Sequence, residues 1–277
     1  MKEFKSFFKK VGGNEGSKCH YPTRLDTYGC GCSHDCSYCY EKSLLNFRKL
    51  WNPLEPAVAD IGKIRKKIAK LDTSEVIRLG GMTDCFQPCE SIYKVTYETI
   101  RALNARRIHY LIVTKSAMVA DYINIMDKEL AHIQVTITTT DDELSKTYEK
   151  ASVPSERIKA IEKLEENGFD VSVRLSPYIP QYVDVEKINH IKCKKLLVEF
   201  LRVNSWIEKW FPLDYSDWTV KESGYKHLPL EKKIKLLDKL HFEQMTVCED
   251  ESKAYEYWQN HYNFNKNDCC NLSFAKK

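Results

Sequence analysis

Three clustered cysteines are the part of this chain whose spacing points most directly to chemistry. Cys32, Cys36 and Cys39 stand in the run GCGCSHDCSYCY, at the spacing Cys-x3-Cys-x2-Cys. Three clustered thiolates suit an iron–sulfur cube in which the protein holds three irons and leaves the fourth open. The alternative is a closed cluster or a zinc site that takes Cys30 or Cys19 as its fourth ligand. An open iron would bind a substrate or cofactor, so the spacing favours catalysis over a purely structural role.

Composition and cysteine usage indicate an intracellular globular protein with a substantial core. The chain has 277 residues, 43% of them hydrophobic and 12% aromatic, with a formal net charge of +4. This length fits one large domain, or one domain with a small appendage, and the mild positive charge permits contact with nucleic acid. We expect no membrane span and no signal peptide, because no apolar run is long enough. The odd count of 11 cysteines favours metal ligation in a reducing compartment, so we expect a cytoplasmic protein.

Short β-branched runs alternate with helical patterns through most of the chain. We expect strands near residues 24–28 and at residues 75–79, 109–114, 134–139, 170–175 and 194–201. We expect helices at residues 61–71, 92–103, 122–130 and 155–167, the last followed by Gly168 as a left-handed cap. The alternation predicts right-handed βαβ units and a parallel sheet. About six such units would make an α/β fold, an open, partial parallel (β/α)6 barrel with its active face at the strand carboxyl ends.

A change in composition after residue 203 divides the chain into two parts. Residues 1–203 are the expected barrel core, and residues 204–277 are an expected C-terminal extension with helices at 230–240 and 252–259. The extension begins with the aromatic-rich run WIEKWFPLDYSDWTV. Its rings would either form a small core of the extension or stack on a nucleic-acid base.

Several segments resemble one branch of the radical S-adenosylmethionine (SAM) superfamily, the spore photoproduct lyase-like proteins often labelled DNA repair photolyases. The matching segments are GCGCSHDCSYCY, GGMTDCFQPCE, IVTKS, VTITTTDDELSKTYEKASVPSERIKAIEKLEENGF and VSVRLSPYIP. They follow the order of the family between residues 23 and 183. The resemblance implies a partial barrel of the radical SAM type.

The resemblance also implies the cofactors. Cys32, Cys36 and Cys39 would hold a [4Fe–4S] cluster, with the aromatic Tyr38 directly before the last ligand as a cofactor-site residue. The free iron would be chelated by the amino and carboxylate groups of SAM. Reductive cleavage would then release a 5′-deoxyadenosyl radical that abstracts hydrogen from a substrate. The electron would come from an external donor of the flavodoxin or ferredoxin type.

The strand-end motif RLGGMTD resembles the position that contacts the methionine amino group of SAM in this superfamily. Gly80 and Gly81 lack a β-carbon, so their main chain can approach a ligand closely. Met82 replaces the acidic residue often seen after the glycines, and Asp84 follows two positions later as the candidate side-chain contact. Lys115, in VTKS, matches the family lysine that contacts the SAM carboxylate.

Two later strands supply further candidate cofactor contacts. Thr136 and Thr138 share one strand face by period-two alternation and resemble the family's hydroxyl position, although both are also ordinary strand formers. Arg174 alternates with the apolar Val173 and Leu175, so it should face the barrel mouth. There it would contact cofactor or substrate, or pair with a carboxylate.

Other cysteines are candidates for a radical donor and for a second metal site. Photoproduct lyases carry a hydrogen-donating cysteine where this chain has Gly81, so Cys85 or Cys89 would have to act as the catalytic thiol instead. The extension contains Cys248, Cys269 and Cys270, which would ligate a second iron–sulfur cluster or zinc. Those three are one ligand short of a closed site, which Cys193, Cys85 or Cys89 would complete. The alternative is that these are buried core thiols.

Three functional hypotheses follow. The first is a radical SAM enzyme acting on a nucleobase in DNA or RNA, by analogy with the family. The second is radical modification of a peptide or small metabolite, which an auxiliary C-terminal cluster would favour. The third is a non-catalytic iron–sulfur or zinc-binding module.

Overall fold

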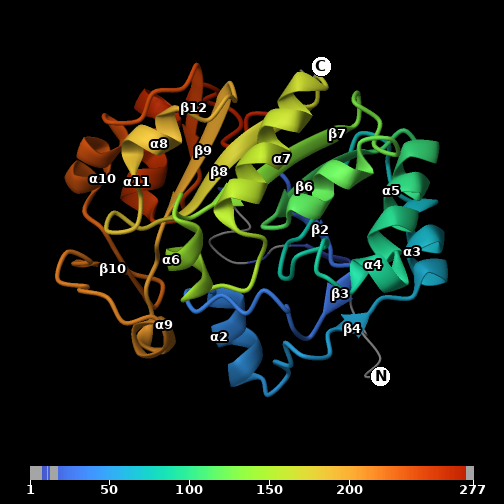
Figure 1. The fold of residues 1–277 in the computed structure, drawn as a ribbon, viewed down its shortest axis with the longest axis horizontal. Helices are drawn as coiled ribbons and strands as arrows, with labels where there is room; N and C mark the ends of the chain where they lie inside the picture. Colours follow the sequence, from blue (N-terminus) through green and yellow to red (C-terminus); the bar gives the residue numbers. More distant parts are fainter. Residues whose placement is uncertain (1–7, 11, 13–17, 273–277) are drawn as a thin grey trace.

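A mostly parallel sheet is the framework of the molecule (Figure 1). The structure, a computed structural model, describes residues 8–10, 12 and 18–272. Within them, eight strands form the central sheet in the order β1-β2-β5-β6-β7-β8-β9-β12. β1 runs antiparallel to β2, and every other neighbouring pair is parallel. The order is that of an open α/β sheet, as the sequence predicted.

The strands are short at the edges of the sheet and longer at its centre. They are β1 (Phe8–Lys10), β2 (Thr23–Leu25), β5 (Val76–Leu79), β6 (His109–Thr114), β7 (Ala131–Ile137), β8 (Asp170–Tyr178), β9 (Lys195–Phe200) and β12 (Gln244–Val247). Two small antiparallel pairs lie outside this sheet, β3 (Tyr28–Gly29) with β4 (Ala57–Val58), and β10 (Val220–Glu222) with β11 (Tyr225–His227).

Helices connect the strands and cover the sheet. They are α2 (Tyr40–Phe47), α3 (Ile61–Ile68), α4 (Glu90–Tyr93), α5 (Val95–Ala105), α6 (Asp142–Lys146), α7 (Pro154–Glu166), α8 (Val185–Asn189), α9 (Ser205–Trp210), α10 (Leu230–Leu237) and α11 (Ser252–Tyr257), with a 3-10 turn η1 (Ala117–Tyr122) and a π turn η2 (Trp258–Tyr262). Figure 1 shows α3, α4 and α5 at one end of the sheet and α8, α10 and α11 at the other. Local signals set several boundaries. Asp60 caps α3 through the Lys63 amide, and Gly168 follows α7 at φ 74°, as expected for a left-handed cap.

Period-two alternation gives the sheet an outer and an inner face. Ile77 and Ile112 belong to the main hydrophobic core that the helices cover. The intervening Val76 and Leu111, with Leu197, form a second, smaller cluster. The C-terminal segment 268–272 packs on that inner cluster through Cys269, Cys270 and Leu272. The end of the described chain therefore fills part of the concave side of the sheet.

The helix expected at residues 122–130 is wrong. The structure has η1 and a series of turns there before β7 begins at Ala131. The Asn104 side chain donates to the Ile125 carbonyl at 2.6 Å, and the Asp127 carboxylate accepts from the Glu129 amide at 2.9 Å. These side chains compete with helical hydrogen bonding, which the apolar period alone does not reveal.

The helix expected at residues 92–103 is two helices. Lys94 has φ 50°, a left-handed conformation that ends α4 and begins α5. The buried Glu90 carboxylate accepts from the amides of Thr96 and Tyr97, both at 2.9 Å, and so stabilises a new helix start.

The segment after residue 203 continues the central sheet. β12 pairs in parallel with β9, from Gln244 opposite Lys195 to Val247 opposite Val198. Trp218 is buried and donates its indole N–H to the Leu201 carbonyl at 2.8 Å. Trp206 is partly exposed and packs beside Trp210 at a centroid distance of 5.2 Å. The extension thus contains a further strand that the sequence pattern did not reveal.

None of the described helices has the length and apolar character of a membrane-spanning segment.

Candidate active site

The three clustered cysteines lie at the edge of the sheet where the parallel strands end. They occupy the loop between β3 and α2, and all three line one cavity. The loop is tied to the segment after α6, because the Ser37 amide donates to the Tyr148 carbonyl at 2.8 Å. The Lys150 amide donates in turn to the His34 carbonyl at 2.7 Å. Main-chain contacts of this kind fix the loop before any metal binds.

Gly80 and Gly81 line the same cavity, at the end of β5. Gly80 has φ +80°, and a Cβ there would lie 2.2 Å from the Val113 carbonyl oxygen of the neighbouring strand. A Cβ at Gly81 would lie 2.4 Å from Cδ of Arg24. Glycine is therefore required by the packing of the strand ends. This close approach brings the main chain of the turn to the cavity wall.

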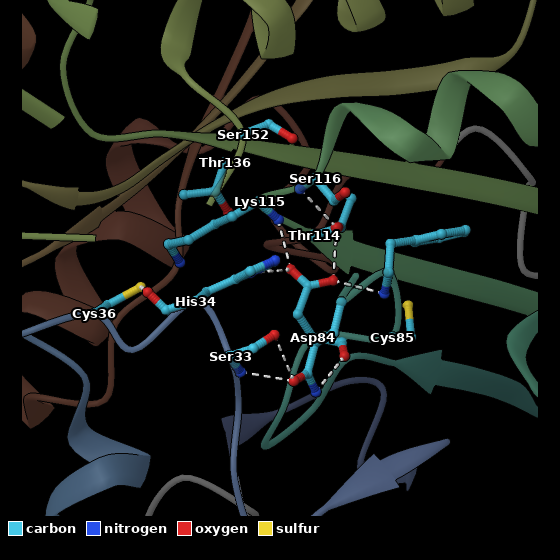
Figure 2. Close-up of polar contacts among 12 residues, drawn as sticks. Ser33, His34, Cys36, Asp84, Cys85, Thr114, Lys115, Ser116, Thr136 and Ser152 are labelled. Atoms are coloured by element: carbon cyan, nitrogen blue, oxygen red, sulfur yellow. Dashed lines mark hydrogen bonds and ion pairs between the residues drawn. The ribbon is translucent and has the colours of Figure 1, made fainter. Parts of the chain in front are cut away.

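Asp84 joins three segments of the site rather than pointing a free carboxylate at a ligand (Figure 2). Its carboxylate accepts from the Thr114 hydroxyl at 2.8 Å, from the Lys115 amide at 2.6 Å and from the Phe86 amide at 2.8 Å. His34 Nδ1, in the cysteine loop, lies 3.4 Å from Asp84 Oδ2. Burial opposes ionisation, but these contacts outweigh it and lower the pKa of Asp84 to about 2.

Lys115 also lines the cavity and points toward the cysteine loop. Figure 2 shows its side chain extending toward Cys36. Its Nζ lies 5.6 Å from the centre of the Tyr38 ring. Across the part of the chain that is described, no carboxylate lies within ion-pair distance of this ammonium group. It is a positive charge beside the cysteines that is available to an anionic ligand.

The inner face of the central strands supplies a second polar wall. Thr136 and Arg174 both line the cavity, as their alternation predicted. Arg174 donates to the Gln134 side chain at 2.6 Å and pairs with Glu199. Burial opposes ionisation of Glu199, but Arg174, together with Arg202, Ser176 and Arg78, outweighs it and lowers the pKa of Glu199 to about 2. Arg174 is thus held by a carboxylate while still facing the cavity.

Tyr38 and Thr138 lie outside the cavity lining. Both bind the buried Glu149: the Tyr38 hydroxyl donates to its carboxylate, and Thr138 Oγ1 does so at 3.3 Å. Arg157, also buried, completes an ion pair with Glu149. The two residues therefore belong to a buried network that supports the cysteine loop on the side away from the cavity.

Cys85 and Cys89 are also outside the cavity lining. Cys85 is 1% exposed and packs in the main core, and Cys89 caps α4. Figure 2 shows Cys85 on the opposite side of Asp84 from Cys36. Neither thiol therefore lines the cavity that contains the cysteine loop.

Cys248 and Cys269 line the cavity, and Cys270 is buried beside them. Cys19 and Arg78 line it as well. Alternation could have identified Arg78, because it lies between Ile77 and Leu79 as Arg174 lies between its apolar neighbours. Asp26, which accepts from the Met82 amide at 2.9 Å, carried no such signal.

The donor set fits a cluster with three protein ligands. Cys32, Cys36 and Cys39 share the cavity, and Cys30 does not line it. Cys19, the other candidate for a fourth ligand, does line it, and its electrostatic neighbours include Cys248 and Cys270. Burial raises the pKa of all three thiols, that of Cys32 to about 12, so ligation must displace protons. In the portion of the chain described, no three His, Cys, Asp or Glu side chains are placed to hold a metal ion. A cluster distributes its thiolates over several irons, so its ligands do not have to surround a single ion.

Comparison with known proteins decides the family. The Radical SAM superfamily matches residues 27–192, which include the three cysteines, the strand-end glycines and Lys115. The chain belongs to the radical SAM superfamily. The family implies a [4Fe–4S] cluster and SAM. The match confirms the resemblance to the superfamily seen in the sequence.

Individual proteins are also similar to this chain. The uncharacterized protein MJ0683 of Methanocaldococcus jannaschii is 30% identical over 166 residues, covering 57% of this chain and 61% of that protein. The match thus spans less than two thirds of the relative's length. Spore photoproduct lyase complexed with dinucleoside spore photoproduct has a similar structure, with TM-score 0.58 and 15% identity over 86% of this chain and 76% of that one. A mutant of that enzyme gives TM-score 0.63 and 14% identity over 88% and 80%. These likenesses show that this radical SAM protein has the same fold.

The contact at Gly80 generates a testable expectation. We expect Gly80→Ala to lower the free energy of unfolding by about 1–3 kcal/mol more than Gly224→Ala, as measured by urea denaturation. The two glycines have nearly equal φ, +80° and +82°, but a Cβ at Gly224 would meet nothing within 4 Å. The comparison therefore isolates the clash with the Val113 carbonyl. Equal effects of the two substitutions would contradict this account of the strand end.

The contacts of Asp84 predict a pH-dependent contribution to stability. Because its folded pKa is depressed from 3.8 to about 2, its ionised form stabilises the fold above pH ~4, and this contribution is lost as the pH falls toward 2. We expect Asp84→Asn to lower the free energy of unfolding by about 2 kcal/mol at pH 7, and the deficit to shrink in acid. The exposed Asp121→Asn should change it by less than about 0.5 kcal/mol. A deficit that is the same at pH 7 and in acid would count against this role.

Proposed function

We propose that the protein uses a [4Fe–4S] cluster on Cys32, Cys36 and Cys39 to cleave SAM reductively, and that the 5′-deoxyadenosyl radical so formed acts on a nucleobase of DNA or RNA. The observation that carries the proposal is the single cavity lined by these thiols, by Gly80 and Gly81 and by Lys115. An external donor of the flavodoxin or ferredoxin type would supply the electron.

The residues around the cysteines are suited to seat the cofactor. Lys115 would bind the carboxylate of SAM, because its ammonium group faces Cys36 and no carboxylate of the described residues lies within ion-pair distance of it. The main chain of Gly80 and Gly81 would face the methionine amino group. Asp84 would support the cofactor site indirectly, by holding Lys115 and the cysteine loop in place. Its carboxylate oxygens already contact Thr114, Lys115 and His34. Thr136 would contribute a hydroxyl from β7.

Aromatic and basic side chains at the cavity favour a nucleobase substrate. Tyr40, Trp51 and Tyr255 line it, and so do Lys18 and Arg202. Base–aromatic stacking and cationic contacts to phosphate are the usual means of binding unpaired nucleotides. One similar structure is described as spore photoproduct lyase complexed with dinucleoside spore photoproduct, which supports the same substrate class here. A small aliphatic metabolite would not need three aromatic rings.

Trp51 is held at the cavity by a cation–π contact. Lys42 Nζ lies 5.9 Å from the centre of the Trp51 ring and 5.3 Å from that of Trp210. The ammonium group is itself paired with Asp35 at 2.7 Å. The arrangement orients one large aromatic face near the cysteine loop before a substrate arrives.

SAM cleavage by the anaerobically reconstituted protein tests the proposal. With dithionite as reductant, we expect the parent to form 5′-deoxyadenosine and Cys36→Ala to form none above background. Cys30→Ala is the matched control, because it lies in the same loop but outside the cavity lining, and it should keep the parent's activity. Cleavage by Cys36→Ala at the parent's rate would contradict the assignment of the cluster ligands.

The substrate class has its own test. We expect short single-stranded oligonucleotides to bind with an affinity that falls as salt rises, because phosphates release counterions on binding. Trp51→Ala should weaken binding about 5- to 100-fold, the loss of one base–aromatic stack. Phe264→Ala, an exposed ring outside the cavity lining, should leave binding unchanged. A flat salt dependence, or equal effects of the two substitutions, would argue against a nucleic-acid substrate.

A further inference from the structure

Four cysteines from three distant parts of the chain meet on the inner face of the sheet. Cys19 precedes β2, Cys248 directly follows β12, and Cys269 and Cys270 lie in the C-terminal segment. The Cys248 amide donates to the Val198 carbonyl at 2.9 Å, which places it at the carboxyl end of β12 beside β9. Cys19, Cys248 and Cys269 line the cavity described above, and Cys270 packs in the same cluster as Cys248 and Cys269.

The C-terminal pair is held there by a specific set of hydrogen bonds. The buried Asp268 carboxylate accepts from the Tyr21 hydroxyl at 2.5 Å and from the amides of Cys270 and Leu272 at 2.9 and 3.2 Å. Lys195 donates to the Asn271 carbonyl at 2.7 Å. Because Tyr21 is two residues from Cys19, the same carboxylate links the two ends of the described chain.

The thiols are close enough to affect one another. The Cys269 thiol lies in hydrogen-bond contact with the thiols of Cys248 and Cys270. Cys270 and Cys248 are also electrostatic neighbours of Cys19. His20 Nδ1 lies 4.0 Å from Cys269 Sγ. The group is thus a cluster of neighbouring sulfurs, whereas ordinary core cysteines are scattered singly among apolar side chains.

Positive charge surrounds these sulfurs. Arg78 lines the cavity, and its buried Nε has no hydrogen-bond partner within the described chain. Its nearest electrostatic neighbours include Cys19, Cys248 and Cys270. Arg174, on the adjacent inner face, also lies near Cys248 and Cys270. Arg78, Arg174 and Arg202 share one carboxylate neighbour, Glu199. A tetrathiolate metal centre would add an anion beside these arginines, whereas four neutral thiols would not.

We propose that Cys19, Cys248, Cys269 and Cys270 ligate a second iron–sulfur cluster, on the inner face of the sheet and facing the same cavity as Cys32, Cys36 and Cys39. A single zinc ion would need four sulfurs within about 2.3 Å of one point. No three such groups in the described residues are placed to hold a single ion. A cluster bears its ligands on separate irons, so its four sulfurs do not have to surround one ion. The site is independent of the function proposed above, because none of its ligands belongs to the first cysteine group.

The proposal fixes the fourth ligand and gives the C-terminal segment a role. The sequence suggested Cys193, Cys85 or Cys89 to complete the set. Cys85 and Cys89 lie outside the cavity, and Cys193 contacts the carbonyls of Val171 and Lys195 at 3.6 and 3.5 Å instead. Cys19 takes that place. The cluster would fasten the segments before β2 and after β12 to the concave side of the sheet.

Iron and sulfide analysis of a protein that lacks the first site tests the proposal. Cys32, Cys36 and Cys39 are all changed to Ala, and the protein is reconstituted anaerobically with iron and sulfide. We expect about four irons and about four sulfides per chain to remain. The protein should also keep the visible absorbance of an iron–sulfur cluster. Adding Cys269→Ala and Cys270→Ala to this background should remove them. Adding Cys193→Ala instead should leave them in place.

Several results would overturn it. They are absence of iron from the triple variant, iron that persists after Cys269 and Cys270 are replaced, or zinc in place of iron in protein isolated without reconstitution. Circular dichroism checks that each variant is folded. The single substitutions Cys19→Ala and Cys248→Ala test the two proposed ligands outside the C-terminal pair, and each should lower the iron content. SAM cleavage by the parent is measured separately. If the second site were disproved, the proposed function would still stand. If SAM cleavage were not found, the proposal of a second cluster would still stand.

Discussion

The carboxylate of Asp84 is the interaction on which the architecture of the site depends. It binds the end of β6 through Thr114 and Lys115 and the cysteine loop through His34, while its own segment follows β5. A buried carboxylate with these partners is stable only while all of them are in place. The contact therefore couples the position of the cysteine loop to the two strand ends that would seat the cofactor. Gly80 makes the same junction possible, because only a residue without Cβ fits against the Val113 carbonyl.

Strand alternation is the second organising constraint. Apolar residues such as Ile77 and Ile112 face the covering helices, and Arg78, Thr136 and Arg174 face the cavity. A charged inner wall is tolerated because Glu199 balances Arg174 and because the cavity admits polar ligands. The same inner face receives the C-terminal segment, so cysteines from the start and the end of the sheet lie in one cavity. In this arrangement the proposed auxiliary centre and the radical site would act on a shared space.

Much of this was accessible from the sequence, and the failures have physical causes. The cysteine spacing, the strand-end glycines and Lys115 are local patterns, and the parallel strands follow from alternating periods. The helix expected at 122–130 failed because the Asn104 and Asp127 side chains hold the chain in turns, a tertiary effect. The role of Asp84 and the proximity of Cys19 to Cys270 depend on contacts between residues far apart in sequence. Tyr38 and Thr138 lie behind the loop because Glu149, which no motif marked, engages both.

The central claim is that the cluster on Cys32, Cys36 and Cys39 has an iron open to SAM, and electron paramagnetic resonance tests it most directly. The measurement uses the protein with Cys269→Ala and Cys270→Ala, reconstituted and reduced, so that only the first cluster contributes. Our account predicts that adding SAM changes the g values of the reduced cluster, because the cofactor becomes a ligand. A spectrum that SAM leaves unchanged, with the cluster fully assembled, would contradict it.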